Sequence, residues 1–351
     1  MPVHRSIVYA LASAALFGAS TPLAKLLLSD AAPLMVAGLL YLGSGVGLAA
    51  WLGLRALSKG AEEASPIDRW QWPWLAGAIA AGGVAGPALL MFGLARTDGS
   101  AASLLLNLEA VLTAALAWLV FRENVDRRIF LGMAAIVAGG VLLSWDQTPR
   151  AGGLAGPLLV AAACLAWAVD NNLTRKVSGG DAATIACLKG LIAGSVNLAL
   201  ALAAGAALPA AGTLLAAAAL GFAGYGVSLA LFVVALRGLG TARTGAYFSV
   251  APFFGAALAL LVLNESPSLA FWIAGALMAL GVWLHLSERH EHAHMHEPME
   301  HSHPHVHDEH HRHAHGEDWD GREPHAHSHC HGRLRHSHPH YPDLHHRHDH
   351  G

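Results

Sequence analysis

Glu109 is the residue whose type and position most clearly suggest chemistry. It lies about eight residues into an apolar run at 101–121, roughly 12 Å from the end of that run at 1.5 Å per helical residue. If the run crosses a membrane, an ionised carboxylate there costs about 3 kcal/mol or more and should face a cavity or a partner. Burial favours the neutral acid, so Glu109 could exchange a proton, and Asn107 could line the same cavity. The alternative is a protonated Glu109 with only a structural hydrogen bond.

A second polar cluster lies near the end of the apolar run 153–174, where Asp170, Asn171 and Asn172 follow one another. Three consecutive polar side chains at that depth could form a vestibule on the inner side of a membrane. They could equally be the polar end of an ordinary helix, and the sequence leaves both interpretations open.

Two lysines occur inside apolar runs, Lys25 and Lys189. Each is near enough to a helix end for its ammonium group to reach the membrane surface, as long basic side chains commonly do. The alternatives are contact with a substrate carboxylate, or an ion pair with Glu109 or Asp170.

Glycines and prolines interrupt several apolar runs. Equivalent breaks in the two halves of a transporter point to its binding site, although small residues also allow helices to pack closely. The interruptions are Gly82, Gly83, Gly86 and Pro87 in the third run, Gly221, Gly224 and Gly226 in the eighth, and Pro22 and Pro252 in the first and ninth.

The C-terminal 62 residues, 290–351, hold 23 of the 25 histidines. This segment has too few large apolar residues to form a core, so we expect a disordered tail. Neutral imidazole binds Zn, Ni, Co and Cu, and alternate residues share one side of an extended chain, so neighbouring imidazoles could chelate one ion. The candidate ligands are His292, His294, His296, His301, His303, His305, His307, His325, His327, His329, Cys330, His331, His336, His338 and His340.

The rest of the chain has the composition of a membrane protein. The sequence is 54% hydrophobic and 13% charged, whereas soluble domains carry about 25% charged residues. Runs long enough to cross a bilayer predict ten membrane helices. They are 7–28, 33–54, 73–95, 101–121, 128–145, 153–174, 183–204, 211–236, 243–263 and 268–286.

Loop charges predict the orientation of these helices. With the N-terminus in the cytoplasm, the inner segments carry eleven Lys and Arg residues and the outer loops carry two, Arg96 and Arg150. This asymmetry follows the positive-inside rule. It predicts an integral protein of the cytoplasmic (inner) membrane with both termini in the cytoplasm.

The chain contains an internal repeat. Residues 113–124 (TAALAWLVFREN) align with 255–266 (GAALALLVLNES) at 7 of 12 positions, and each segment ends the fourth helix of a five-helix unit at an acidic residue, Glu123 or Glu265. The same register pairs Gly82 with Gly224, and a looser match pairs 17–25 with 167–175. Because five is odd, the second unit must be inverted, an architecture of many secondary transporters with a site between the halves.

Two five-helix units of this size, each ending its fourth helix in an apolar run and then x-Glu, resemble the EamA-type members of the drug/metabolite transporter superfamily. The resemblance covers about residues 5–286, and the Gly that usually precedes the Glu is replaced by Arg122 and Asn264. It implies a proton-linked or facilitative carrier for small organic solutes, with a central cavity lined by the first four helices of each half and peripheral fifth helices.

The predicted fold is therefore an all-α membrane protein with two inverted five-helix repeats, 1–145 and 146–286, and a disordered cytoplasmic metal-binding tail, 287–351. We expect a secondary transporter, with export favoured, whose tail delivers divalent metal or regulates transport. The alternatives are an organic-solute carrier whose tail only buffers metal, and a membrane-tethered metal store or sensor. No catalytic or nucleic-acid motif is present, no cofactor is required, and a homodimer is compatible with the sequence.

Overall fold

The structure is a computed structural model in which a helical unit, Met1–Ser287, is separate from a second unit, Glu288–Gly351. It describes residues 3–59, 69–121, 127–146, 153–174, 177, 181–239 and 241–286 of the first unit, and 291–296, 299–305, 325–331 and 334–339 of the second.

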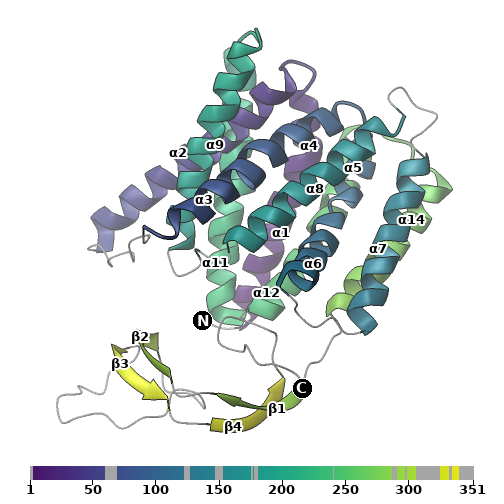
Figure 1. Cartoon of the computed structure of the whole chain (residues 1–351). Helices are drawn as coiled ribbons and strands as arrows, with labels where there is room; N and C mark the ends of the chain where they lie inside the picture. The colour runs from purple at the N-terminus through teal and green to yellow at the C-terminus, as the bar shows by residue number, and fades with distance from the viewer. Residues whose placement is uncertain are drawn as a thin grey trace. The chain divides into compact units, whose positions relative to one another are not determined.

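The first unit consists of helices (Figure 1). The first half contains α1 (Val3–Leu27), α2 (Pro33–Lys59), α3 (Trp72–Ala78), the π-helical segment η1 (Ile79–Ala85), α4 (Gly86–Leu94), α5 (Gly99–Leu105), α6 (Leu108–Phe121) and α7 (Arg127–Asp146). The second half contains α8 (Ala155–Thr174), α9 (Ala182–Ala203), α10 (Ala211–Gly221), the π-helical segment η3 (Phe222–Val227), α11 (Ser228–Leu239), α12 (Thr241–Phe248), α13 (Ala251–Val262) and α14 (Leu269–Leu286).

Within the described residues, nine helical segments are long and apolar enough to cross a membrane. A tenth apolar segment, Leu269–Leu284, is shorter. Large apolar side chains cover the outside of the bundle, among them Leu57 at 87% exposed and Leu261 at 77% exposed. Such a surface suits contact with lipid rather than water, because isolated soluble proteins rarely expose large apolar patches.

The third and eighth predicted spans are both interrupted by a π-helical turn, η1 and η3, at the glycine clusters. The fourth predicted span is not the continuous helix that the sequence predicted, because it breaks between α5 and α6. The ninth breaks between α12 and α13, directly before Pro252, where the sequence indicated an interruption. In the repeat register, the π-helical turns and the breaks in the two halves coincide to within one residue.

The two halves are packed together along α2 and α9. A methyl group on Gly45 would lie 2.5 Å from the backbone nitrogen of Leu191, and one on Gly194 would lie 2.4 Å from that of Leu42. Small residues thus allow the two backbones to approach closely, which is the usual basis of tight helix packing in membranes. The fifth helices of the halves, α7 and α14, lie beside each other at one edge of the bundle (Figure 1).

The second unit contains four short strands, where the sequence predicted no ordered structure. β1 (Glu291–His296) pairs with β4 (Leu334–Pro339), and β2 (Met299–His305) pairs with β3 (His325–His331), both antiparallel. Histidines at alternate positions match the two-residue period of an extended chain. The registers place His opposite His at several positions, for example His294 opposite His336 and His303 opposite His327.

Candidate functional site

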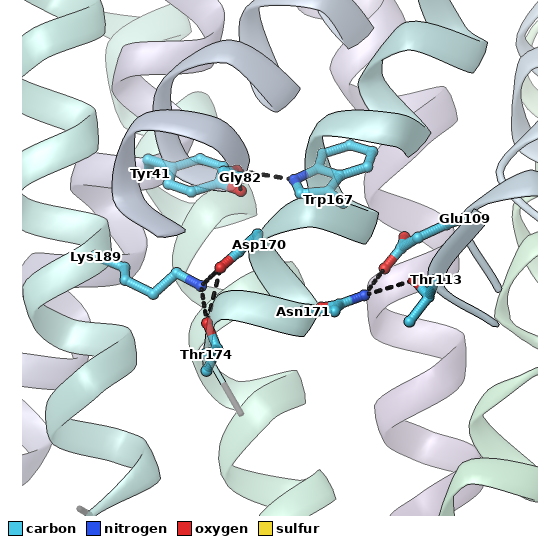
Figure 2. A network of polar contacts seen from close by, with 9 residues as sticks. All are labelled: Tyr41, Gly82, Glu109, Thr113, Trp167, Asp170, Asn171, Thr174 and Lys189. Carbon is cyan, nitrogen blue, oxygen red and sulfur yellow. Dashed lines mark hydrogen bonds and ion pairs between the residues drawn. The ribbon is translucent and has the colours of Figure 1, made fainter. Parts of the chain in front are cut away.

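Asp170 on α8 and Lys189 on α9 form an ion pair inside the helical unit (Figure 2). Lys189 Nζ donates to Oδ1 and Oδ2 of Asp170 at 2.5 and 2.6 Å, and Thr174 Oγ1 donates to Oδ1 at 2.8 Å. The side chain of Lys189 is only 18% exposed and that of Asp170 only 9%. Of the alternatives that the sequence left open for Lys189, the structure has the ion pair with Asp170.

The backbone carbonyl of Gly82, in η1, holds two aromatic side chains next to this ion pair. Trp167 Nε1 donates to it at 2.9 Å, and the Tyr41 hydroxyl donates at 3.1 Å (Figure 2). The carbonyl is available because a π-helical turn rearranges the hydrogen bonds of the helix. Gly82 also gives Asp170 room, since a methyl group at residue 82 would lie 2.0 Å from Oδ2 of Asp170.

Glu109 is the first-turn acidic residue of α6 and bonds to α8 of the other half. Asn171 Nδ2 donates to Glu109 Oε1 at 2.9 Å and to Thr113 Oγ1 at 3.3 Å (Figure 2). Glu109 is half-buried and Asn171 is exposed, so the pair borders accessible space. Asp170 and Lys189 are near enough to act electrostatically on the Glu109 carboxyl, and intramembrane carboxyl groups normally face the bundle interior.

Lys25 fixes the end of α4, at the turn between two membrane-length segments. Its Nζ donates to the carbonyl of Leu94 at 2.9 Å and to the carbonyl of Thr97. Carbonyls at a helix C-terminus lack partners within the helix and carry partial negative charge, so a lysine satisfies them well.

Glu265, one of the two acidic residues that end the repeat motif, caps the start of α5. Its carboxylate accepts from the backbone N–H of Gly99 at 2.6 Å and of Ser100 at 2.9 Å. The preceding Asn264 has φ +50°, a left-handed conformation that Gly and Asn tolerate best, which explains why a Gly is usual there. Lys25 and Glu265 together hold both sides of the α4–α5 turn. Glu123 lies outside the described residues.

The two halves repeat one contact of the site with different side chains. A methyl group at residue 82 would meet Asp170. A methyl group at residue 224, in η3, would instead meet Ser20, whose Cβ would lie 2.8 Å away. The register that pairs 17–25 with 167–175 also pairs Ser20 with Asp170. The backbone arrangement is therefore shared, and only the first half's glycine faces a charged group.

The repeat has no carboxyl group at the position that corresponds to Glu109. In the repeat registers, Glu109 corresponds to Ala251 and Asn171 corresponds to Thr21. The scaffold is thus nearly symmetric while its charges are not, which concentrates the candidate chemistry on one side of the interface between the halves.

Four other predicted site residues have packing or backbone roles in the structure. Asn107 lies in the break between α5 and α6, is only 4% exposed, and donates to the carbonyl of Leu104 at 2.8 Å, so it does not join Glu109 as the sequence suggested. A methyl group on Gly86 would lie 2.7 Å from Trp167 Nε1. Pro87 and Pro252 lie at the starts of α4 and α13, where their rigid backbone suits a new helix.

Sequence reasoning missed four residues of this network: Tyr41, Thr113, Trp167 and Thr174. Trp167 could have been found from its match with Phe17 in the looser repeat register. The others carry no signal of their own, because a Tyr or Thr within an apolar helix is ordinary.

The predicted metal ligands belong to the second unit. His307 and His340 lie outside the described residues, and the remaining candidates lie in β1 to β4, where the structure describes the backbone. Among the side chains that are described, no group of three or more His, Cys, Asp or Glu residues could hold a metal ion.

A bundle of apolar membrane-length helices with a polar network inside it, at the interface of two similar halves, is characteristic of a membrane transporter. The sequence pattern of the EamA-like transporter family matches residues 4–145 and again 154–287. This chain belongs to the EamA-like transporter family.

A curated relative agrees with this assignment, and a solved structure shares the fold. An uncharacterized transporter of Methanothermobacter thermautotrophicus is 30% identical over 284 residues, which cover 76% of this chain and 82% of the relative. A protein crystal structure matches 80% of this chain and 95% of its own chain with a TM-score of 0.57. At 20% identity, that structure indicates a shared fold only.

Proposed function

We propose that this protein is a secondary carrier, an exporter of a small solute, and that the Glu109–Asn171 pair is its transport site. The observation that carries the proposal is this hydrogen bond between α6 of the first half and α8 of the second. A carboxyl group inside a membrane bundle is energetically costly, so such a group usually has a functional role. This one also borders accessible space. An interface between two repeats is also where carriers bind their substrates.

The carrier crosses the cytoplasmic (inner) membrane ten times, in two inverted five-helix repeats. Both of its termini lie in the cytoplasm. Three observations support this architecture: the coinciding π-helical turns, the coinciding helix breaks, and the shared contacts of Gly82 and Gly224. In such a carrier, rocking of one half against the other would expose the site to each side alternately.

The cytoplasmic tail binds a divalent transition metal and regulates transport or buffers the metal. Its support is the density of histidines in 290–351. The lack of a metal-ligand cluster among the described membrane side chains favours an organic solute as cargo, with the tail acting on metal separately. This favours the organic-solute carrier with a metal-binding tail over a dedicated metal pathway.

The test is flux into proteoliposomes by the full-length protein and its Glu109→Gln variant, with a panel of amino acids, amines and the metals Ni, Co, Zn and Cu. We expect Glu109→Gln to lose transport while retaining membrane insertion and thermal stability. Asp30→Asn is the matched control, because it makes the same acid-to-amide change at an exposed position. Wild-type flux by Glu109→Gln would refute the assignment of the site.

A further inference from the structure

The lysines that could neutralise an anionic solute within the described bundle already have strong partners. Lys189 gives two hydrogen bonds to the Asp170 carboxylate and is within 3.4 Å of Thr174 Oγ1. Lys25 is bonded to two backbone carbonyls of the α4–α5 turn. An anion at the site would have to displace Asp170 from Lys189 and leave that carboxylate shielded from water without its counter-charge, which is unfavourable.

The Glu109 carboxylate is in the opposite situation. Among the described residues, the hydrogen-bond donor that reaches it is a neutral side-chain amide, that of Asn171. Because Asn171 Nδ2 serves both Glu109 and Thr113, its amide oxygen is left as an acceptor within the described part of the chain. The pair therefore offers a negative charge and a neutral acceptor on the side that borders accessible space.

Aromatic surface lies next to this acceptor pair. Trp167 and Asn171 are four residues apart on α8, so their side chains lie on the same face of the helix and are neighbours. Trp167 is half-buried, and its ring nitrogen is fixed to the Gly82 carbonyl together with the Tyr41 hydroxyl. A fixed indole face attracts cations through its quadrupole and also packs against apolar groups.

A transition-metal ion fits this site poorly. Such ions take several imidazole, thiolate or carboxylate ligands, and the described side chains hold no group of three of these. Cys164 of α8 lies close to Glu109, but it is buried and its thiol is directed to the carbonyl of Leu105 at 3.7 Å. One carboxylate, one amide oxygen and an indole instead match a monovalent cation that carries its own apolar group.

We propose that Glu109, Asn171 and Trp167 bind a monovalent organic cation, a protonated amine with an apolar or aromatic substituent. The ammonium group lies against the Glu109 carboxylate and the Asn171 amide oxygen, and the substituent lies against the Trp167 ring. This inference rests on the proposed function and adds the charge class of the substrate. It also predicts discrimination against zwitterions, because Lys25 and Lys189 are already bonded and not available for their carboxylate.

The experiment compares three indole compounds that differ in charge: tryptamine (cation), tryptophan (zwitterion) and indole-3-propionate (anion). Binding to the full-length protein in detergent is measured by equilibrium dialysis at pH 7. We expect tryptamine to bind at least about tenfold more tightly than tryptophan, and indole-3-propionate to bind no better than tryptophan. Glu109→Gln should weaken tryptamine binding about tenfold or more, whereas Asp30→Asn should leave it unchanged.

Variants of Trp167 separate a binding role from a structural one. Trp167→Phe keeps an aromatic face but loses the hydrogen bond to Gly82, and Trp167→Leu loses both. We expect tryptamine binding to persist in Trp167→Phe and to fall about threefold or more in Trp167→Leu, at equal thermal stability. Equal binding by both variants would remove Trp167 from the site.

The charge class is wrong if tryptophan or indole-3-propionate binds as tightly as tryptamine, or if tryptamine binding survives Glu109→Gln. It is also wrong if neither tryptamine nor the smaller amines 2-phenylethylamine and butylamine bind. These failures differ from failure of the carrier proposal. Glu109-dependent flux of a zwitterion or an anion would leave the carrier intact and exclude the cation class, whereas flux that is independent of Glu109 would refute both.

Discussion

Replacement of Gly82 by alanine should damage the ion pair at the centre of the site. A methyl group at residue 82 would lie 2.0 Å from Oδ2 of Asp170 and 2.4 Å from its Cγ, well inside the optimal separation of about 3.5 Å. Asp170 cannot simply move aside, because Lys189 and Thr174 hold its carboxylate. Overpacking costs about 1–3 kcal/mol, and loss of a hydrogen bond to a charged group costs about 1.5–3 kcal/mol. We therefore expect Gly82→Ala to lower the free energy of unfolding by about 3–5 kcal/mol.

Two other glycines provide a scale for this effect. Gly224→Ala meets only the Cβ of Ser20 at 2.8 Å, with its next neighbours at 3.5 Å or more, so we expect a loss of about 1 kcal/mol. Gly53→Ala meets nothing within 4 Å and should be neutral or stabilise α2 by about 0.5–1 kcal/mol, since alanine favours helix.

The assay is the thermal unfolding of detergent-solubilised variants together with proteoliposome flux. Removal of the whole obstructing side chain gives the sharpest control, because the Cβ of Asp170 also lies 2.4 Å from the added methyl group. In an Asp170→Gly background, Gly82→Ala should therefore cost much less than in the wild type. That coupling is what a double-mutant cycle measures. If Gly82→Ala is as stable and active as Gly53→Ala, or if its cost is the same with and without Asp170, the packing argument is refuted.

Three further predictions concern the ion pair, the α4–α5 turn and the tail. Lys189→Met alone should destabilise the protein by about 3 kcal/mol or more, because it leaves a shielded carboxylate unpaired, and adding Asp170→Asn should recover much of that loss in the same unfolding assay. Glu265→Gln should lower stability by about 1–2 kcal/mol, because it replaces a charge-assisted cap of α5 by a neutral one, and a loss no larger than that of Asp30→Asn would contradict the capping role. Deletion of 290–351 should remove the metal bound per protein, measured by dialysis and metal analysis. In the full chain, metal binding should fall as pH drops through about 6.5, because protons compete with the metal for neutral imidazole. If the deletion leaves the tolerance of cells to Ni, Co, Zn and Cu unchanged, the tail has no role in metal handling.

Much of the fold could be predicted because the bilayer imposes simple rules on a sequence. Apolar runs of membrane length, the repeat that ends at Glu265, and the glycine clusters around Gly82 and Gly224 are all local or periodic signals. The break within the fourth span was not predicted, because Asn107 carries no sequence signal strong enough to end a helix within an apolar run. The break within the ninth span lies directly before Pro252, which the sequence did mark as an interruption.

The candidate site was predicted only in part, since burial and pairing depend on which helices meet. Glu109 and Asp170 stood out because charged residues are rare in membrane spans. Their partners were not fixed by sequence: Lys189 could have reached the membrane surface, yet it pairs with Asp170, and Lys25 could have met a substrate, yet it holds a turn.

By itself, the sequence determined that the chain is a membrane protein with two similar halves, which charged residues lie within its spans, and that its histidines gather in the tail. It could do so because hydropathy, charge and repetition are properties of the chain read along its length. Only the tertiary structure decided that Glu109 faces Asn171, that both lysines are already bonded, and that Gly82 makes room for Asp170. Those facts depend on contacts between helices that are distant in sequence, and the net charge left available at the site follows from those contacts rather than from the residues alone.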